Sequence, residues 1–133
     1  MSQENVESTE RFLDAHNRRD FDVLAGLVTE AFEWVTTNAG LVESGSFRGR
    51  AGIEAYFADV DDTWNDYRLS AWEVRDLSEV VLAAISVEAR GRSSGVAFRT
   101  QIWSVSDFRD GRCWRSRTFL DPGDALRVAG LTE

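Results

Sequence analysis

Residues 11–34, RFLDAHNRRDFDVLAGLVTEAFEW, predict a helix, a tight corner, a second short helix and an entering strand. We expect the first helix over about residues 4–18, because apolar and weakly polar side chains recur every three or four positions at Thr9, Phe12, Leu13 and His16. Asp20 can cap the second helix, and residues 32–37 are aromatic and β-branched, as strands are. This stretch therefore predicts that helices precede the sheet.

The middle of the chain predicts a loop and then a third helix. Residues 38–50 are polar and contain glycines, which is typical of a loop. Helical spacing returns for three turns at Ile53, Tyr56, Phe57, Val60 and Trp64.

The second half predicts long strands joined by short turns. Alternating patterns indicate strands over residues 67–77, 80–90, 96–108 and 113–120. Asp110-Gly111 is the strongest hairpin signal, and short connections of this kind imply an antiparallel meander. Asp121 and Pro122 then begin a short final helix.

This element order predicts an α+β fold in one domain that spans residues 1–133. A curved antiparallel sheet wrapped around the N-terminal helices would form a cone with an internal pocket. With five Trp and eight Phe, the chain has enough aromatic side chains for a bulky core or for a pocket that takes a flat apolar molecule.

The composition of the chain limits the classes of binding partner and the compartment that we expect. The net charge of -8 argues against nucleic acid and against anionic membranes, because both attract basic surfaces. Cys113 is the only cysteine, so no internal disulfide is possible and a reducing compartment is expected. With no signal-peptide pattern and no apolar run of membrane-spanning length, we expect a cytoplasmic protein.

Several short motifs, in this order and spacing, resemble one family over nearly the whole chain. They are Arg11-Phe12, Asn17-Arg18-Arg19-Asp20, Glu33-Trp34, Phe47-Arg48-Gly49 with Ile53 and Tyr56-Phe57, Ser94-Gly95-Val96, Arg109-Asp110-Gly111, and Phe119-Leu120-Asp121 with Ala125-Leu126. The chain resembles the SnoaL-like branch of the nuclear transport factor 2-like superfamily. That family includes polyketide cyclases, ketosteroid isomerases, epoxide hydrolases, dehydratases and members with no known activity, so the fold does not give the function.

The resemblance argues against ketosteroid isomerase chemistry. The isomerase tyrosine that donates to the oxyanion falls at Phe12, and the aspartate base falls at about Thr36. Neither Phe nor Thr performs those roles at neutral pH. The second oxyanion donor falls at about Gln101, whose amide keeps a hydrogen-bond donor.

The other activities of the family also lack a complete set of residues. SnoaL-like cyclases use an acid/base pair of Asp and His type, and His16 is the only histidine, on the helix face expected to look inward. Epoxide hydrolases of this fold use an Asp-Arg-Asp set. Arg99 shares a strand face with Gln101, but the carboxylates expected for this set are missing.

His16 and Gln101 are the catalytic candidates, as proton carrier and oxyanion donor. His16 is alternatively a structural histidine, and Gln101 an ordinary core hydrogen-bonder. The resemblance places the strand face of residues 99, 101 and 103 on the concave side. The expected ligand-binding residues are Phe12, Trp34, Thr36, Phe57, Trp103 and Thr118.

We expect no metal and no cofactor, since ligand-spaced histidines and cysteines and a glycine-rich phosphate loop are missing. The arginines of the last hairpin, among them Arg115 and Arg117, form an anion patch or are paired with acids such as Asp107. The half-apolar outer face of strand 80–90 suggests a homodimer through the sheet.

Two functions follow from these observations. The first is a cone that binds a small apolar or aromatic ligand, with cofactor-free isomerase, cyclase or hydratase chemistry in the catalytic version. The second is a non-catalytic ligand-binding or dimerisation module.

Overall fold

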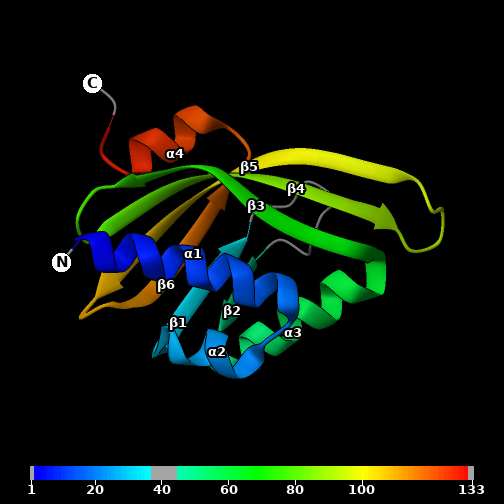
Figure 1. The fold of residues 1–133 in the computed structure, drawn as a ribbon, viewed down its shortest axis with the longest axis horizontal. Helices are drawn as coiled ribbons and strands as arrows, with labels where there is room; N and C mark the ends of the chain where they lie inside the picture. The colour runs from blue at the N-terminus through cyan, green and yellow to red at the C-terminus, as the bar shows by residue number, and fades with distance from the viewer. Residues whose placement is uncertain (1, 37–44, 132–133) are drawn as a thin grey trace.

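The computed structural model describes residues 2–36 and 45–131 and has the predicted α+β architecture (Figure 1). Helices and strands follow in the order α1 Ser2–Arg18, α2 Phe21–Gly26, β1 Val28–Thr36, β2 Gly45–Arg48, α3 Gly49–Thr63, β3 Trp64–Asp76, β4 Val80–Gly91, β5 Ala97–Arg109, β6 Arg112–Phe119 and α4 Pro122–Val128. The strands form one curved, open sheet in the order β2-β1-β6-β5-β4-β3. The first three helices cover its concave face, and α4 lies on the opposite side (Figure 1).

The antiparallel meander is confirmed for β3 to β6, and β1 closes onto β6 in parallel. The predicted hairpin turn is confirmed too, since Asp110 and Gly111 both have positive φ angles, of 53° and 79°. Such a pair of residues makes a two-residue turn whose twist suits the flanking strands.

Several boundaries differ from the sequence predictions. Residues 45–48, predicted as loop, form β2 and pair with the end of β1, so Phe47 lies opposite Trp34. Trp64 was assigned to the third helix but begins β3, where the backbone turns to extended geometry. Residues 38–44 of the predicted loop, and residue 37 at the end of the predicted strand, lie outside the described residues.

The corner after α1 is built as predicted. Arg19 adopts a left-handed φ of 57°, and the Asp20 carboxylate accepts from the Val23 backbone N–H at 3.2 Å. Asp121 caps α4 in the same way through the Gly123 N–H at 2.8 Å. These caps satisfy N–H groups that a helix cannot bond internally.

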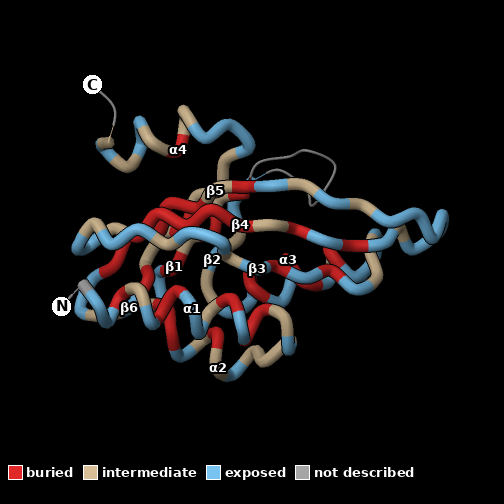
Figure 2. Tube along the Cα trace, turned by 45° about the horizontal axis from the view of Figure 1, so that its top comes forward, coloured by how far each residue is buried: buried red, intermediate tan, exposed pale blue. Residues whose placement is uncertain are grey.

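Each face of the sheet carries its own apolar core. The larger one lies between the concave face and α1 to α3, and includes Phe32, Phe57 and Val87. The smaller one lies under α4, around Leu82 and Val105. Burial is concentrated in the middle of the sheet, while the β4–β5 hairpin extends beyond the helices and is mostly exposed (Figure 2).

Replacing Gly52 with alanine tests how closely α3 approaches β2. A Cβ at this buried position would lie 2.5 Å from the Phe47 carbonyl carbon, which is backbone and must move. We expect Gly52→Ala to lower the free energy of unfolding by about 2 kcal/mol, as overpacking does. Urea denaturation measures it.

The control is Gly26→Ala, since a Cβ there meets nothing within 4 Å. Alanine favours the helix, so this variant should be as stable as the wild type or up to about 1 kcal/mol more stable. Equal stability of the two variants would contradict the close contact.

Candidate functional site

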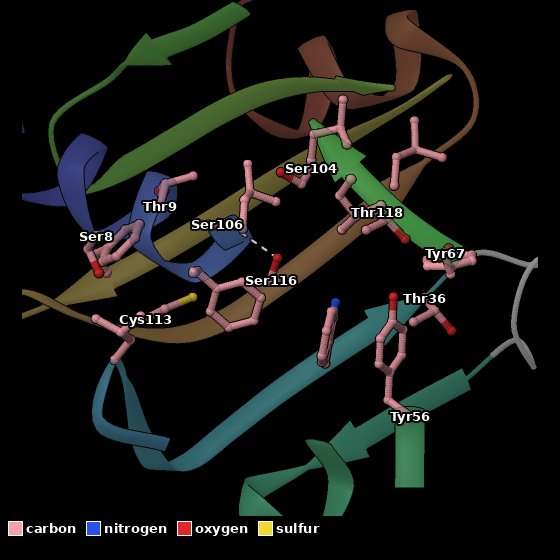
Figure 3. A pocket seen from close by; sticks show the side chains of 18 residues that line it. Ser8, Thr9, Thr36, Tyr56, Tyr67, Ser104, Ser106, Cys113, Ser116 and Thr118 are labelled. Carbon is pink, nitrogen blue, oxygen red and sulfur yellow. Dashed lines mark hydrogen bonds between the residues drawn. The ribbon is translucent and has the colours of Figure 1, made fainter. Parts of the chain in front are cut away.

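A pocket lies between α1 and the concave face of the sheet (Figure 3). The cavity has a volume of ≈ 60 Å³. Its apolar wall consists of Phe12, Leu13, Leu27, Trp34, Leu69, Ile85, Ile102 and Phe108. Its polar wall consists of the thiol of Cys113 and the hydroxyls of Ser8, Thr9, Thr36, Tyr56, Tyr67, Ser104, Ser106, Ser116 and Thr118. Among the described lining residues none carries a formal charge.

Four of the predicted pocket residues line it. Phe12 comes from α1, Trp34 and Thr36 from β1, and Thr118 from β6. Trp34 stacks on Tyr56 with ring centroids 3.9 Å apart, and Phe12 meets Trp34 edge-on at 5.3 Å. This aromatic group forms one side of the pocket, and its role toward a ligand stays a prediction.

The placement predicted for Gln101 is wrong. Gln101 is exposed and pairs with Ser86 on the outer face, as Arg99 pairs with Glu88. Side chains alternate along a strand, so the even-numbered residues of β5 face the pocket instead. Ile102, Ser104 and Ser106 occupy the positions where residues 99, 101 and 103 were expected.

The predicted aromatic residues Trp103 and Phe57 also lie outside the pocket lining. Trp103 shares the outer parity of Gln101 and packs into the small core under α4. Phe57 is 1% exposed and belongs to the main core, where it contacts Phe21 with ring centroids 5.3 Å apart. Both side chains pack in an apolar core, and neither forms the pocket surface that it was expected to form.

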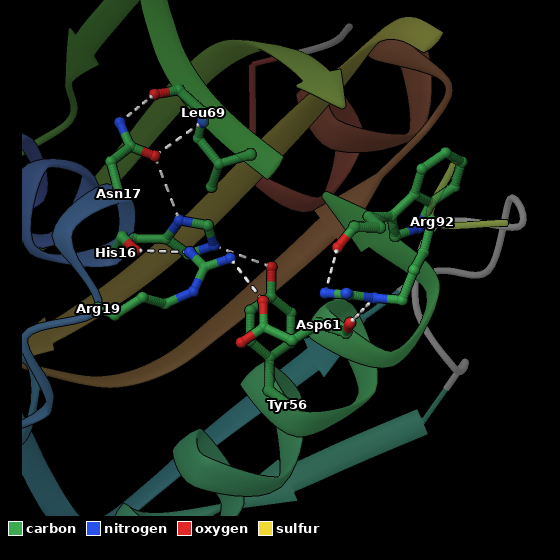
Figure 4. A network of polar contacts seen from close by, with 8 residues as sticks. His16, Asn17, Arg19, Tyr56, Asp61, Leu69 and Arg92 are labelled. Carbon is green, nitrogen blue, oxygen red and sulfur yellow. Dashed lines mark hydrogen bonds and ion pairs between the residues drawn. The ribbon is translucent and has the colours of Figure 1, made fainter. Parts of the chain in front are cut away.

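His16 faces inward, as predicted, but it lies behind the pocket wall (Figure 4). The ring is fully buried, with 0% exposure. Its Nε2 is 3.1 Å from the Tyr56 hydroxyl, and its Nδ1 is 3.4 Å from Asn17 Oδ1. Tyr56, which lines the pocket, therefore separates His16 from any ligand.

Burial lowers the pKa of His16 to about 3, and the nearby positive charge of Arg19 contributes in the same direction. Arg19 donates to the backbone oxygen of His16 at 2.9 Å and pairs with Asp61 at 2.9 Å (Figure 4). Its guanidinium also lies over the Phe57 ring, 4.7 Å from the centroid. His16 is thus a neutral imidazole at physiological pH. Of the two alternatives that the sequence left open, proton carrier and structural histidine, this state favours the structural one.

The serine hydroxyls of the pocket were missed by the sequence reasoning, which had predicted those of Thr36 and Thr118. Ser106 and Ser116 lie opposite each other on β5 and β6, and their hydroxyls are 3.1 Å apart. Ser104 is buried on the same face. Serines at every second position between Ile102 and Phe108 were the available signal, because polar side chains in such an apolar stretch must face a polar space or a partner.

The titratable groups of the lining hold their protons. Burial raises the pKa of Tyr67 to about 12 and that of Cys113 to about 12. Burial likewise raises the pKa of Tyr56 well above its ordinary value, and interaction with Tyr67 adds to this. At neutral pH these groups are hydrogen-bonding groups rather than anions.

Three arginines of the last hairpin, Arg109, Arg115 and Arg117, are paired with an acid or stacked on an aromatic ring. Arg115 and Arg117 both bind the buried carboxylate of Asp107, at 2.9 Å and 3.1 Å. Arg109 and Arg115 lie over the Trp114 ring. This cluster sits on the outer face of the sheet, away from the pocket.

Residues 2–36 and 45–131 contain no cluster of His, Cys, Asp and Glu that could hold a metal ion. None of the helices in those ranges is both long and apolar enough to cross a membrane.

The sequence profile of the SnoaL-like domain matches residues 9–116, which is most of the chain. The chain belongs to the SnoaL-like family. Comparison with curated proteins gave no match.

Solved structures of low sequence identity share the SnoaL-like fold. A nuclear transport factor 2-like protein of unknown function from Burkholderia pseudomallei has a TM-score of 0.79 at 18% identity, over 95% of this chain and 97% of that one. TerC co-crystallised with polyporic acid has a TM-score of 0.79 at 21% identity, over 96% and 98%. A protein from Burkholderia xenovorans has a TM-score of 0.75 at 22% identity, over 97% and 98%.

The neutral state of His16 predicts how stability depends on pH. Because the folded pKa lies below the unfolded value of 6.5, the unfolded chain takes up the proton first as the pH falls. The stability that the neutral His16 ring contributes is fully present above pH 6.5 and is lost as the pH falls from there toward pH 3. Between about pH 7.5 and about pH 5 we expect a loss of about 2 kcal/mol.

Urea denaturation across this range measures the loss, and His16→Gln is the control because glutamine does not titrate. The chain has one histidine, so no other side chain has its ordinary pKa in this window. A wild type as insensitive to pH as the variant would contradict the buried neutral ring.

Proposed function

We propose that this SnoaL-like protein binds a small, uncharged, mostly apolar organic molecule in the concave pocket. The observation that carries the proposal is the lining, in which eight apolar side chains face nine hydroxyls and one thiol. Apolar walls with a few placed polar groups are typical of small-molecule sites, because the walls supply affinity and the polar groups supply orientation.

The lining favours a neutral ligand over a charged one. The described lining residues include no carboxylate, guanidinium or imidazole that would offset a ligand charge. Moving an uncompensated ion into an apolar site costs several kcal/mol, whereas a carbonyl or hydroxyl is satisfied by one or two hydroxyl partners.

The non-catalytic version has more support than the isomerase, cyclase or hydratase version. A general base needs a pKa near the operating pH. Tyr67 and Cys113 have pKa values of about 12, and His16 has one of about 3 behind the wall. Gln101, the expected oxyanion donor, is exposed on the other face.

The volume of the pocket limits the size of the ligand that can bind without a rearrangement of the lining. A cavity of roughly 150 Å³ accommodates benzene, which is more than the ≈ 60 Å³ found here. Binding of a ring therefore requires a lining side chain to turn aside. Phe12 is the partly exposed aromatic residue of the wall and is the side chain we expect to move.

Filling the pocket should abolish binding. We expect flat, uncharged apolar compounds to raise the melting temperature of the wild type, since a ligand of the folded state stabilises it. Ser104→Leu places an isobutyl group in the cavity and should remove this shift. Differential scanning fluorimetry measures the melting temperatures with and without compound.

Ser93→Leu is the matched control, because Ser93 is exposed in the β4–β5 turn and the substitution is the same. It should bind like the wild type, as should Gln101→Ala. No shift with any compound in the wild type, or an unchanged shift in folded Ser104→Leu, would count against the proposal.

We also propose that two copies pair through the outer face of β3, β4 and β5. Helix α4 covers only the end of this face near Leu82. The remainder carries both charges: Arg68 lies opposite Glu88, which binds Arg99 at 2.9 Å. A face with neighbouring rows of opposite charge can meet its own copy about a two-fold axis.

Sedimentation velocity should give the mass of two chains for the wild type. Glu88→Arg would place three arginines side by side across the strands and should yield monomers through like-charge repulsion. Glu79→Arg makes the same charge change in the β3–β4 turn and should remain dimeric. A monomeric wild type would refute the pairing.

A further inference from the structure

The sheet wall of the pocket carries four hydroxyls on two neighbouring strands (Figure 3). Ser104 and Ser106 lie two positions apart on β5, so they share the concave face. On β6, Thr118 lies opposite Ser104 and Ser116 lies opposite Ser106. The hydroxyls of Ser106 and Ser116 are bonded to each other at 3.1 Å. Thr118 donates to the Val35 carbonyl at 3.4 Å, so three of the four hydroxyls have a partner within the protein.

Ser104 is the fourth hydroxyl of this group and differs from the others. The residue is 5% exposed, and within residues 2–36 and 45–131 its oxygen makes no hydrogen bond. In the same ranges, the side-chain atoms that are fully enclosed and unpaired are Thr29 Oγ1 and Arg117 Nε. Ser104 Oγ is not one of them, so it is open to the space that the residue lines, which is the pocket. The sheet wall therefore offers an unused donor and acceptor at Ser104.

The surroundings of Ser104 do not supply the missing partner. Strand β5 lies between β4 and β6, so its backbone N–H and C=O groups are used in the ladders on both sides. Ile102, the next residue on the same face, and Ala83, opposite on β4, are apolar. The hydroxyls of Ser106 and Thr118 already have partners of their own. A partner for Ser104 must come from the contents of the pocket, either a ligand or the water that a ligand displaces.

Ser8 on α1 also lines the pocket without a hydrogen bond to the described residues, but its own helix offers it one. A serine in a helix can turn its hydroxyl to the carbonyl four residues earlier. Its neighbour Thr9 does this and donates to the Asn5 carbonyl at 2.9 Å. A change of rotamer thus satisfies Ser8 without a ligand, whereas the backbone around Ser104 is already paired.

We propose that Ser104 is a specificity-determining residue of the pocket and binds the ligand through one neutral oxygen, a hydroxyl or a carbonyl. This assignment rests on the proposed binding function and adds which wall holds the polar group of the ligand. A serine hydroxyl can donate to either class of oxygen and can accept from a hydroxyl, so both classes fit. Ile102 beside Ser104, and Ile85 opposite Ile102 on β4, give the rest of the ligand an apolar surface.

The melting temperature of the ligand-free protein tests whether Ser104 lacks a partner. Removing an unpaired hydroxyl takes no hydrogen bond from the fold, so Ser104→Ala should melt at or above the temperature of the wild type. Ser106→Ala is the matched comparison, because it breaks the bond to Ser116 and should melt about 2–5 °C lower. A loss in Ser104→Ala as large as that in Ser106→Ala overturns the proposal.

Binding is measured with phenol, benzaldehyde and toluene, which share a ring and differ in the group attached to it. Titrations followed by NMR give the affinity of each compound for the wild type and for Ser104→Ala. One hydrogen bond is worth about fivefold in affinity, so the affinities of phenol and benzaldehyde relative to toluene should fall about fivefold in the variant. Toluene should bind the variant at least as tightly as the wild type, since it then leaves no hydroxyl unpaired.

Two further variants locate the effect. Ser70→Ala removes an exposed hydroxyl from β3 and should leave both affinity ratios unchanged. Ser8→Ala removes the other unpaired serine, and a larger fall of the ratios there than in Ser104→Ala overturns the assignment. Ratios that stay unchanged in Ser104→Ala also overturn it, while the binding of toluene still supports the proposed function. Binding of none of the three compounds overturns the proposed function, and the role of Ser104 with it.

Discussion

The two hydrogen bonds between the Asn17 side chain and the Leu69 backbone hold α1 against the edge strand β3. The amide completes the sheet edge as a short partner strand would, with one donor and one acceptor. Its loss would leave two partly buried backbone groups unpaired, at about 1–3 kcal/mol each. Because α1 crosses the concave face, these bonds also set how far His16 and Phe12 reach toward the sheet, and hence the depth of the pocket.

A neutral histidine suits the place that this anchoring creates. The His16 ring lies 4.8 Å from the Phe57 centroid and 6.3 Å from that of Trp34, so it packs as a small aromatic side chain. Its two ring nitrogens contact the polar atoms of Asn17 and Tyr56. An apolar ring in this place could not form hydrogen bonds with them. Arg19, held by Asp61, makes a proton on the ring still less favourable. The same contacts that stabilise the core therefore keep the His16 ring neutral at physiological pH.

Local signals were enough to predict most of the fold. The caps at Asp20 and Asp121 and the Asp110-Gly111 turn depend on neighbouring residues alone, and all three form as predicted. β2 was missed because it exists only by pairing with β1, a contact between distant residues. Tyr56 as the partner of His16 was missed for the same reason, since forty residues separate them in sequence.

The error at Gln101 has a physical cause in the two cores of the sheet. Trp103 and Val105 share the outer parity of Gln101, which the family resemblance had placed on the concave side. They are buried because α4 covers them, and beyond that helix the same face is exposed at Gln101 and Arg99. Hydrophobicity alone could not assign the face of a strand that is apolar on both sides. The serines identify the face of β5 that lines the pocket. The buried hydroxyls of Ser104 and Ser106 need a polar space or a hydrogen-bond partner, and the concave side provides both.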